Sequence, residues 1–133
     1  MLTAAHCVVN ENTGNEKDPA SIQVLVGAHD TTACNVDKRD ISTFRIHPRY
    51  SNDQGQYDAA IIFLTFPLTF TSTIAPVCLP ASTESLYEGQ KATVTGWGLT
   101  GASEDTSPRL QEVEVTVASN EDCQNTYPGI IKE

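Results

Sequence analysis

The chain of 133 residues is long enough for one ordinary domain, and its 39% of apolar residues can supply a globular core. Seventeen acidic against eight basic residues leave a net charge of −9, which argues against nucleic acid or an anionic membrane surface as a partner. No apolar run approaches the roughly 20 residues that span a bilayer.

Short runs of strand character follow one another along the chain. Residues 21–26 and 43–46 place alternate apolar side chains on one face, as a half-buried strand does. Residues 59–64 form a continuous apolar run, which predicts a strand buried on both faces. Residues 91–95 and 112–117 alternate again, and 112–117 has the clearest period of two.

Polar segments rich in turn residues separate these runs, at 10–19, 47–56 and 100–108. A helix start occurs only near the end, where Ser119 or Asn120 can act as N-cap with acidic residues in the first turn. The regular spacing of short strands and turns predicts an all-β barrel or sandwich.

The four cysteines are Cys7, Cys34, Cys78 and Cys123. None belongs to a C-x-x-C pair, and only Cys7 has a histidine beside it, so the spacing is poor for a zinc site. Wide and irregular spacing is more typical of disulfides in a secreted protein. A bridge between Cys7 and Cys34 stays open at this point.

His6 and Asp58 are the candidate catalytic residues. Imidazole is the side chain that most often acts as a general base near neutral pH. Asp58 stands where a polar loop meets the apolar run, so we expect a largely desolvated carboxylate that accepts strongly from an imidazole N–H. Taken singly, each residue has an ordinary structural alternative, a buried histidine or a turn aspartate.

Four short motifs follow one another: Leu-Thr-Ala-Ala-His-Cys at 2–7, Tyr-Asp-Ala-Ala-Ile at 57–61, Ala-Pro-Val-Cys-Leu-Pro at 75–80 and Val-Thr-Gly-Trp-Gly at 94–98. In this order they resemble landmarks of the chymotrypsin/trypsin family of serine endopeptidases. The resemblance implies a Ser-His-Asp triad in which His6 is the general base and Asp58 the orienting carboxylate. Ala59 departs mildly from the family, which more often has Ile or Leu there.

The resemblance also implies the architecture, an all-β fold that is part of a chymotrypsin-like double β-barrel. Residues 1–65 would form the end part of the N-terminal barrel, and residues 66–80 the linker between the barrels. Residues 81–133 would then begin the C-terminal barrel with its first hairpin.

A family member of this kind is expected to be a secreted endopeptidase, made as a zymogen and monomeric when complete. It would act on protein or peptide substrates and bind protease inhibitors. In the family, the disulfide partners of Cys7, Cys78 and Cys123 lie outside the part covered here, whereas Cys34 matches no usual cysteine. No cofactor or metal is expected; a calcium site of some relatives uses a Glu where this chain has Ala28.

The family's Gly-Asp-Ser-Gly-Gly nucleophile segment does not occur in the 133 residues. The chain is therefore expected to carry two members of the triad and to be inactive alone, since losing the nucleophile costs related triads about 10⁶-fold in turnover. One alternative is a non-catalytic serine-protease homologue that serves as a binding or scaffolding module, and another is a truncated gene product. The presence of both His6 and Asp58 favours the enzyme.

Overall fold

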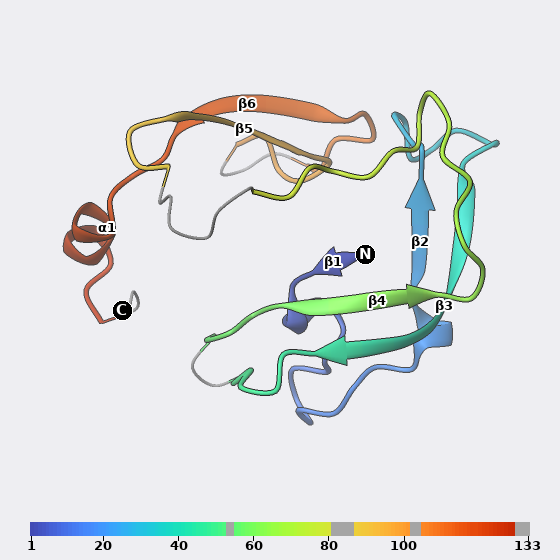
Figure 1. The fold of residues 1–133 in the computed structure, drawn as a ribbon, viewed down its shortest axis with the longest axis horizontal. Helices are drawn as coiled ribbons and strands as arrows, with labels where there is room; N and C mark the ends of the chain where they lie inside the picture. The colour runs from blue at the N-terminus through green and yellow to red at the C-terminus, as the bar shows by residue number, and fades with distance from the viewer. Residues whose placement is uncertain (53–54, 81–86, 102–104, 130–133) are drawn as a thin grey trace. The chain divides into compact units, whose positions relative to one another are not determined.

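The computed structural model describes residues 1–52, 55–80, 87–101 and 105–129. The chain divides into two compact units, Met1–Pro76 and Val77–Glu133. The division falls within the segment 66–80 that the sequence marks as a linker, although the assignment of the units to two barrels remains a prediction. The described residues are mostly β, with one short α-helix (Figure 1).

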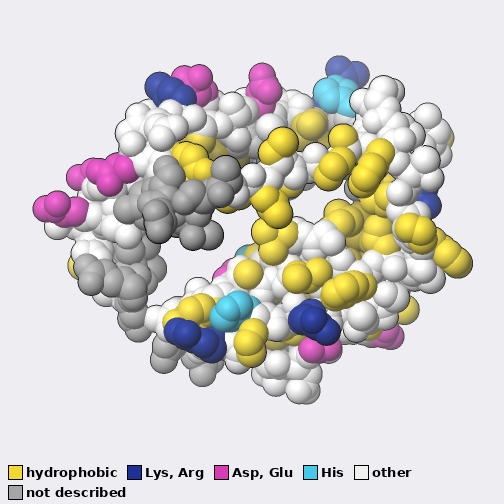
Figure 2. All heavy atoms as spheres, viewed as in Figure 1, with side chains coloured by type: hydrophobic (Ala, Val, Ile, Leu, Met, Phe, Trp, Pro, Cys, Tyr) yellow, Lys and Arg dark blue, Asp and Glu magenta, His cyan; other side chains and the backbone are white. Residues whose placement is uncertain are grey.

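No helix among the described residues is long and apolar enough to cross a membrane. On the face drawn in Figure 2, the described residues show both acidic and basic side chains.

The first unit is built on a four-stranded antiparallel sheet in the order β1-β4-β3-β2. Its strands are β1 (Leu2–Thr3), β2 (Gln23–Val26), β3 (Asp37–Ile46) and β4 (Ala60–Leu64). The early residues of β3 pair with β2 and the later ones with β4, and the register shifts between Ile41 and Thr43. Such an irregularity bends a strand, and the sheet curls accordingly (Figure 1).

The expectation that the run 59–64 is buried on both faces is wrong. Ile61 and Phe63 of β4 are 44% and 42% exposed, while Ala60 and Ile62 are buried. The core lies against one face of this sheet, and the described residues leave the other face of β4 accessible. An apolar run alone does not distinguish these two situations.

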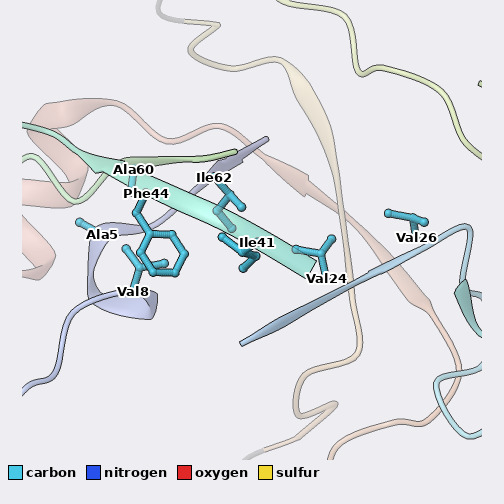
Figure 3. Packing of buried hydrophobic residues seen from close by; sticks show 8 residues of the cluster. All are labelled: Ala5, Val8, Val24, Val26, Ile41, Phe44, Ala60 and Ile62. Carbon is cyan, nitrogen blue, oxygen red and sulfur yellow. The ribbon is translucent and has the colours of Figure 1, made fainter. Parts of the chain in front are cut away.

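The core of the first unit combines strand residues with two residues from the N-terminal turn (Figure 3). The cluster consists of Ala5, Val8, Val24, Val26, Ile41, Phe44, Ala60 and Ile62. Val8 is only 1% exposed and is the largest fully buried side chain among the described residues. Two one-turn 3₁₀ helices flank this region, η1 (Ala5–Cys7) and η2 (Pro19–Ser21).

The second unit contains an antiparallel hairpin, β5 (Lys91–Gly96) with β6 (Gln111–Thr116), followed by α1 (Asn120–Thr126). Both strands lie within a residue or so of the predicted runs 91–95 and 112–117. The helix start is confirmed with Ser119 as N-cap, whose hydroxyl accepts the Asp122 N–H at 2.9 Å. Every residue of β6 is exposed, so its alternation marks no buried face among the described residues.

Candidate active site

His6 is held at the surface by a turn that is anchored in the core. It lies in the middle of η1, between the fully buried Ala5 and the buried Val8 that follows the turn. The Val8 N–H donates to the Ala5 carbonyl at 3.0 Å, which closes the turn. The His6 side chain itself is 54% exposed. Small and apolar neighbours thus fix the backbone while the imidazole stays accessible.

Asp58 lies 52 residues after His6 in the sequence and contacts it in the folded unit. It stands at the end of the β3–β4 connection, just before β4 begins at Ala60. One carboxylate oxygen, Oδ2, lies 2.6 Å from His6 Nδ1, and the other, Oδ1, accepts the His6 backbone N–H at 2.9 Å. The structure therefore brings the two predicted site residues together through two contacts.

The electrostatics of Asp58 differ from the expectation. Its pKa is lowered, first by the hydrogen bond from the His6 backbone N–H and then by the contact with the His6 ring, while burial acts in the opposite direction. The Asp58 side chain is 31% exposed, so the expectation of a largely desolvated carboxylate is wrong. The hydrogen bonds to the charged form favour the ionised carboxylate, whereas desolvation would favour the neutral acid.

This geometry fixes which ring nitrogen can do chemistry. A carboxylate facing Nδ1 favours the tautomer with its proton on Nδ1, so that Nε2 keeps a lone pair for proton transfer. Nε2 points away from Asp58 and lies 3.6 Å from the sulfur of Cys7. The pair can therefore act as a general base with an orienting carboxylate.

A pocket opens beside the pair, lined by His6, Asp58, Glu11, Tyr50, Asn52 and Gly55. The Tyr50 hydroxyl donates to Asn52 Oδ1 at 3.1 Å. The pKa of Tyr50 is raised, mainly by burial and further by the negative charges of Asp58 and Glu11. Sequence reasoning treated residues 47–56 as a polar loop, and no pattern in that loop indicated that Tyr50 and Asn52 border the site.

The residue before Asp58 has an unusual backbone. Tyr57 is left-handed, with φ of 53°, and the Ala59 N–H donates to the Tyr57 carbonyl at 2.7 Å across Asp58. The Tyr57 ring stacks on His47, with centroids 5.0 Å apart, and the Arg49 guanidinium lies 4.1 Å from its centroid. A left-handed residue costs about 1–2 kcal/mol, and an aromatic pair and an exposed cation–π contact contribute about 0.5–1.5 and 0.5–1 kcal/mol. The favourable free energy of the two ring contacts is thus of the same size as the cost of the left-handed backbone and can offset it.

The described residues contain no group of three or more His, Cys, Asp and Glu side chains that could hold a metal. All four cysteines are free in the structure, so the bridge between Cys7 and Cys34 that the sequence left open is not formed.

Known proteins are similar to this chain in sequence and in fold. The family model described as Trypsin matches residues 1–133. The clotting factor G beta subunit of Tachypleus tridentatus is 33% identical over 129 residues, which cover 96% of this chain and 41% of that protein. Serine proteinase stubble of Drosophila melanogaster is 34% identical over 131 residues, which cover 96% of this chain and 16% of that protein. The chain thus spans less than half the length of these relatives.

A solved structure titled "Structure of GrC" matches the fold with a TM-score of 0.83 and 24% sequence identity. The match covers 99% of this chain and 55% of that one. At this identity the likeness establishes the arrangement of the backbone and nothing about activity.

Proposed function

This chain belongs to the trypsin family and has part of its chymotrypsin-like fold, and on that premise we propose that it supplies the His-Asp half of a serine endopeptidase active site. The observation that carries the proposal is the double contact between His6 and Asp58. The carboxylate lies 2.6 Å from Nδ1 and also accepts the His6 backbone N–H, which holds the carboxylate beside the ring and favours the tautomer with its proton on Nδ1.

The proposed reaction is peptide-bond hydrolysis. His6 Nε2 takes the proton of a serine hydroxyl as its oxygen attacks the scissile carbonyl, and later returns that proton to the leaving amine. Asp58 accepts from Nδ1–H throughout and stabilises the imidazolium that forms. The 133 residues contain no Gly-Asp-Ser-Gly-Gly segment, so we propose that residues 1–133 do not hydrolyse peptides by themselves.

The biological setting follows from the same family. The substrates would be proteins or peptides, and protease inhibitors would bind the same site. We propose a secreted, monomeric protein made as a zymogen, whose cysteines form disulfides in an oxidising compartment. The clotting factor and the serine proteinase among its relatives support protein substrates.

The test requires the protein expressed with the sequence that natively flanks residues 1–133 and then activated by proteolysis, because we propose that it is made as a zymogen. Hydrolysis of peptide amides and covalent labelling by a fluorophosphonate probe, which reacts with activated serines, are measured together. We expect both reactions in the unmodified protein, and a loss of turnover of about 10⁶-fold for His6→Ala. His29→Ala, at an exposed histidine away from this site, is the matched control.

A folded protein that neither hydrolyses peptides nor takes the probe would instead support the alternative, a non-catalytic serine-protease homologue with a binding or scaffolding role. Activity in residues 1–133 expressed alone would contradict the proposal that this segment needs a nucleophile from elsewhere.

A further inference from the structure

We propose that Tyr57 is a positioning residue for Asp58: the contacts of its ring with His47 and Arg49 hold the left-handed backbone that aims the Asp58 carboxylate at His6. The inference rests on the proposed function, and it adds to that function a residue that acts through Asp58.

The connection between β3 and β4 is closed at its base. Ile46 pairs with Ala60, and the His47 N–H donates to the Ala59 carbonyl at 2.9 Å. Asp58 lies just inside this closed base, between Ala59 and Tyr57. Ala59 is fixed by the sheet and Gln56 by its bridge to Ser51, so the direction of the Asp58 side chain depends on the backbone angles of the two residues between them, Tyr57 and Asp58.

The two partners of the Tyr57 ring belong to one turn. The Tyr50 N–H donates to the His47 carbonyl at 2.9 Å, and the Arg49 N–H donates to His47 Nδ1 at 3.2 Å. The second hydrogen bond fixes the orientation of the imidazole that stacks on Tyr57. His47 and Arg49 thus present a preformed surface to the ring.

A left-handed backbone at a tyrosine persists only where the surroundings determine it. The Tyr57 carbonyl accepts the Ala59 N–H, and the Tyr57 ring is held by His47 and Arg49. Releasing the ring would let Tyr57 relax toward negative φ. That rotation would turn the Asp58 carboxylate away from the two His6 groups it contacts.

The His6 backbone N–H reports the position of Asp58 directly, because it donates to Asp58 Oδ1. Its hydrogen exchange is followed by NMR in three variants of the natively flanked protein. Tyr57→Ala removes the ring but still disfavours positive φ, and we expect exchange at His6 to accelerate roughly tenfold. Tyr57→Phe keeps the ring and should match the unmodified protein. Tyr57→Gly removes the ring but tolerates positive φ, so its effect should be smaller than that of Ala.

The matched control is Tyr87→Ala. Tyr87 is the other non-glycine residue with positive φ among the described residues, also at 53°, and it belongs to the second unit. This variant should leave exchange at His6 unchanged. If Tyr57→Ala destabilises the whole unit, His47→Ala and Arg49→Ala remove the ring partners one at a time, and each should accelerate exchange at His6 in a unit that remains folded.

Two further readouts separate positioning from general structural loss. In Tyr57→Ala, the pKa of Asp58 should rise toward that of an ordinary carboxyl, because its hydrogen bonds from His6 weaken. In hydrolysis, kcat should fall while KM stays nearly constant, since substrate contacts are unchanged.

Equal behaviour of the Ala, Gly and Phe variants at position 57 would overturn the inference. A ring-dependent exchange rate in a protein without hydrolytic activity would support the positioning role and count against the proposed function.

Discussion

Both oxygens of the Asp58 carboxylate are engaged by one residue, His6, through its backbone and its ring. These contacts exist only while the first unit is folded, because the two residues lie 52 positions apart. The hydrogen bonds lower the pKa of Asp58 in the folded protein, against a smaller opposing effect of burial. The interaction is therefore linked to folding as well as to the proposed catalysis.

This linkage predicts a specific acid sensitivity. The folded-state pKa of Asp58 is depressed, so its contribution to stability is present above the ordinary carboxyl pKa and is lost as the pH falls through the folded-state value. The loss of stability is measured by urea unfolding of the first unit at neutral pH and at pH values below the pKa of an ordinary carboxyl. We expect Asp58→Asn to lose less stability than the unmodified protein over this interval. An equal loss in both would contradict the pKa direction.

At this scale, residue type and motif indicate His6 and Asp58 as candidate site residues, and the structure brings them into contact, while their catalytic role stays a proposal. The exposure of Asp58 could not be predicted, because an apolar run next to an aspartate does not reveal how much solvent reaches the carboxylate. Tyr57 and its partners were also missed as a unit. Left-handed backbone at a tyrosine and stacking across a loop leave no periodic signal in a sequence.

The 3₁₀ turn η1 holds His6 in place because Ala5 within the turn and Val8 directly after it are buried. Val8 fills part of the core beside Phe44 and Ile41, all members of one cluster (Figure 3). We expect Val8→Ala to lower the free energy of unfolding of the first unit by about 2 kcal/mol, from lost burial and the cavity left behind. It should also loosen η1 and accelerate amide exchange there.

The matched control for Val8→Ala is Val113→Ala in β6, where the valine is 56% exposed. Exposed substitutions usually change stability by less than about 0.5 kcal/mol. Denaturant unfolding of both variants tests the comparison. Equal losses at the two sites would contradict the assignment of Val8 to the core.

Gly27, directly after β2, has a left-handed backbone and too little space around it for a Cβ. Its φ is 64°, and a Cβ there would lie 3.1 Å from Ile74 Cγ1 and 3.3 Å from Thr73 Oγ1. Gly14 has a similar φ of 69° with nothing within 4 Å of a Cβ. We expect Gly27→Ala to cost about 1 kcal/mol more than Gly14→Ala, because it adds crowding to the same backbone strain. Thermal or urea unfolding measures the difference. Equal costs would show that residues 73–74 do not crowd a side chain at position 27.

Among the elements, those with a clear pattern could be predicted, including β2, both strands of the second unit and the helix capped by Ser119. The first half of β3 could not, since residues 37–40 are all charged and strand pairing rather than burial defines them. β1 was missed because it has only two residues. The two-sided burial expected for β4 was wrong because the sequence does not show what covers a sheet.

On the scale of the whole molecule, the family model confirms the sequence resemblance, and the backbone shares the fold of a solved structure. The family model covers residues 1–133, and the fold matches a solved structure with a TM-score of 0.83. Composition and the spacing of strands and turns predict only an acidic all-β protein without a nucleic-acid surface. The motifs around His6 and Asp58 carry the further step to a protease, because only they specify a reaction.

The most direct measurement is kcat/KM for peptide hydrolysis by the natively flanked protein and its Asp58→Asn variant. An asparagine keeps the shape but removes the charge that fixes the His6 tautomer, and in the general serine-protease triad this change costs about 10⁴-fold in turnover. Asp105→Asn, at an exposed aspartate of the second unit, serves as the control and should retain full activity. A fall of that size in Asp58→Asn alone would support the His6–Asp58 pair as catalytic. Hydrolysis that is unaffected by Asp58→Asn, or absent from the folded unmodified protein, would contradict it.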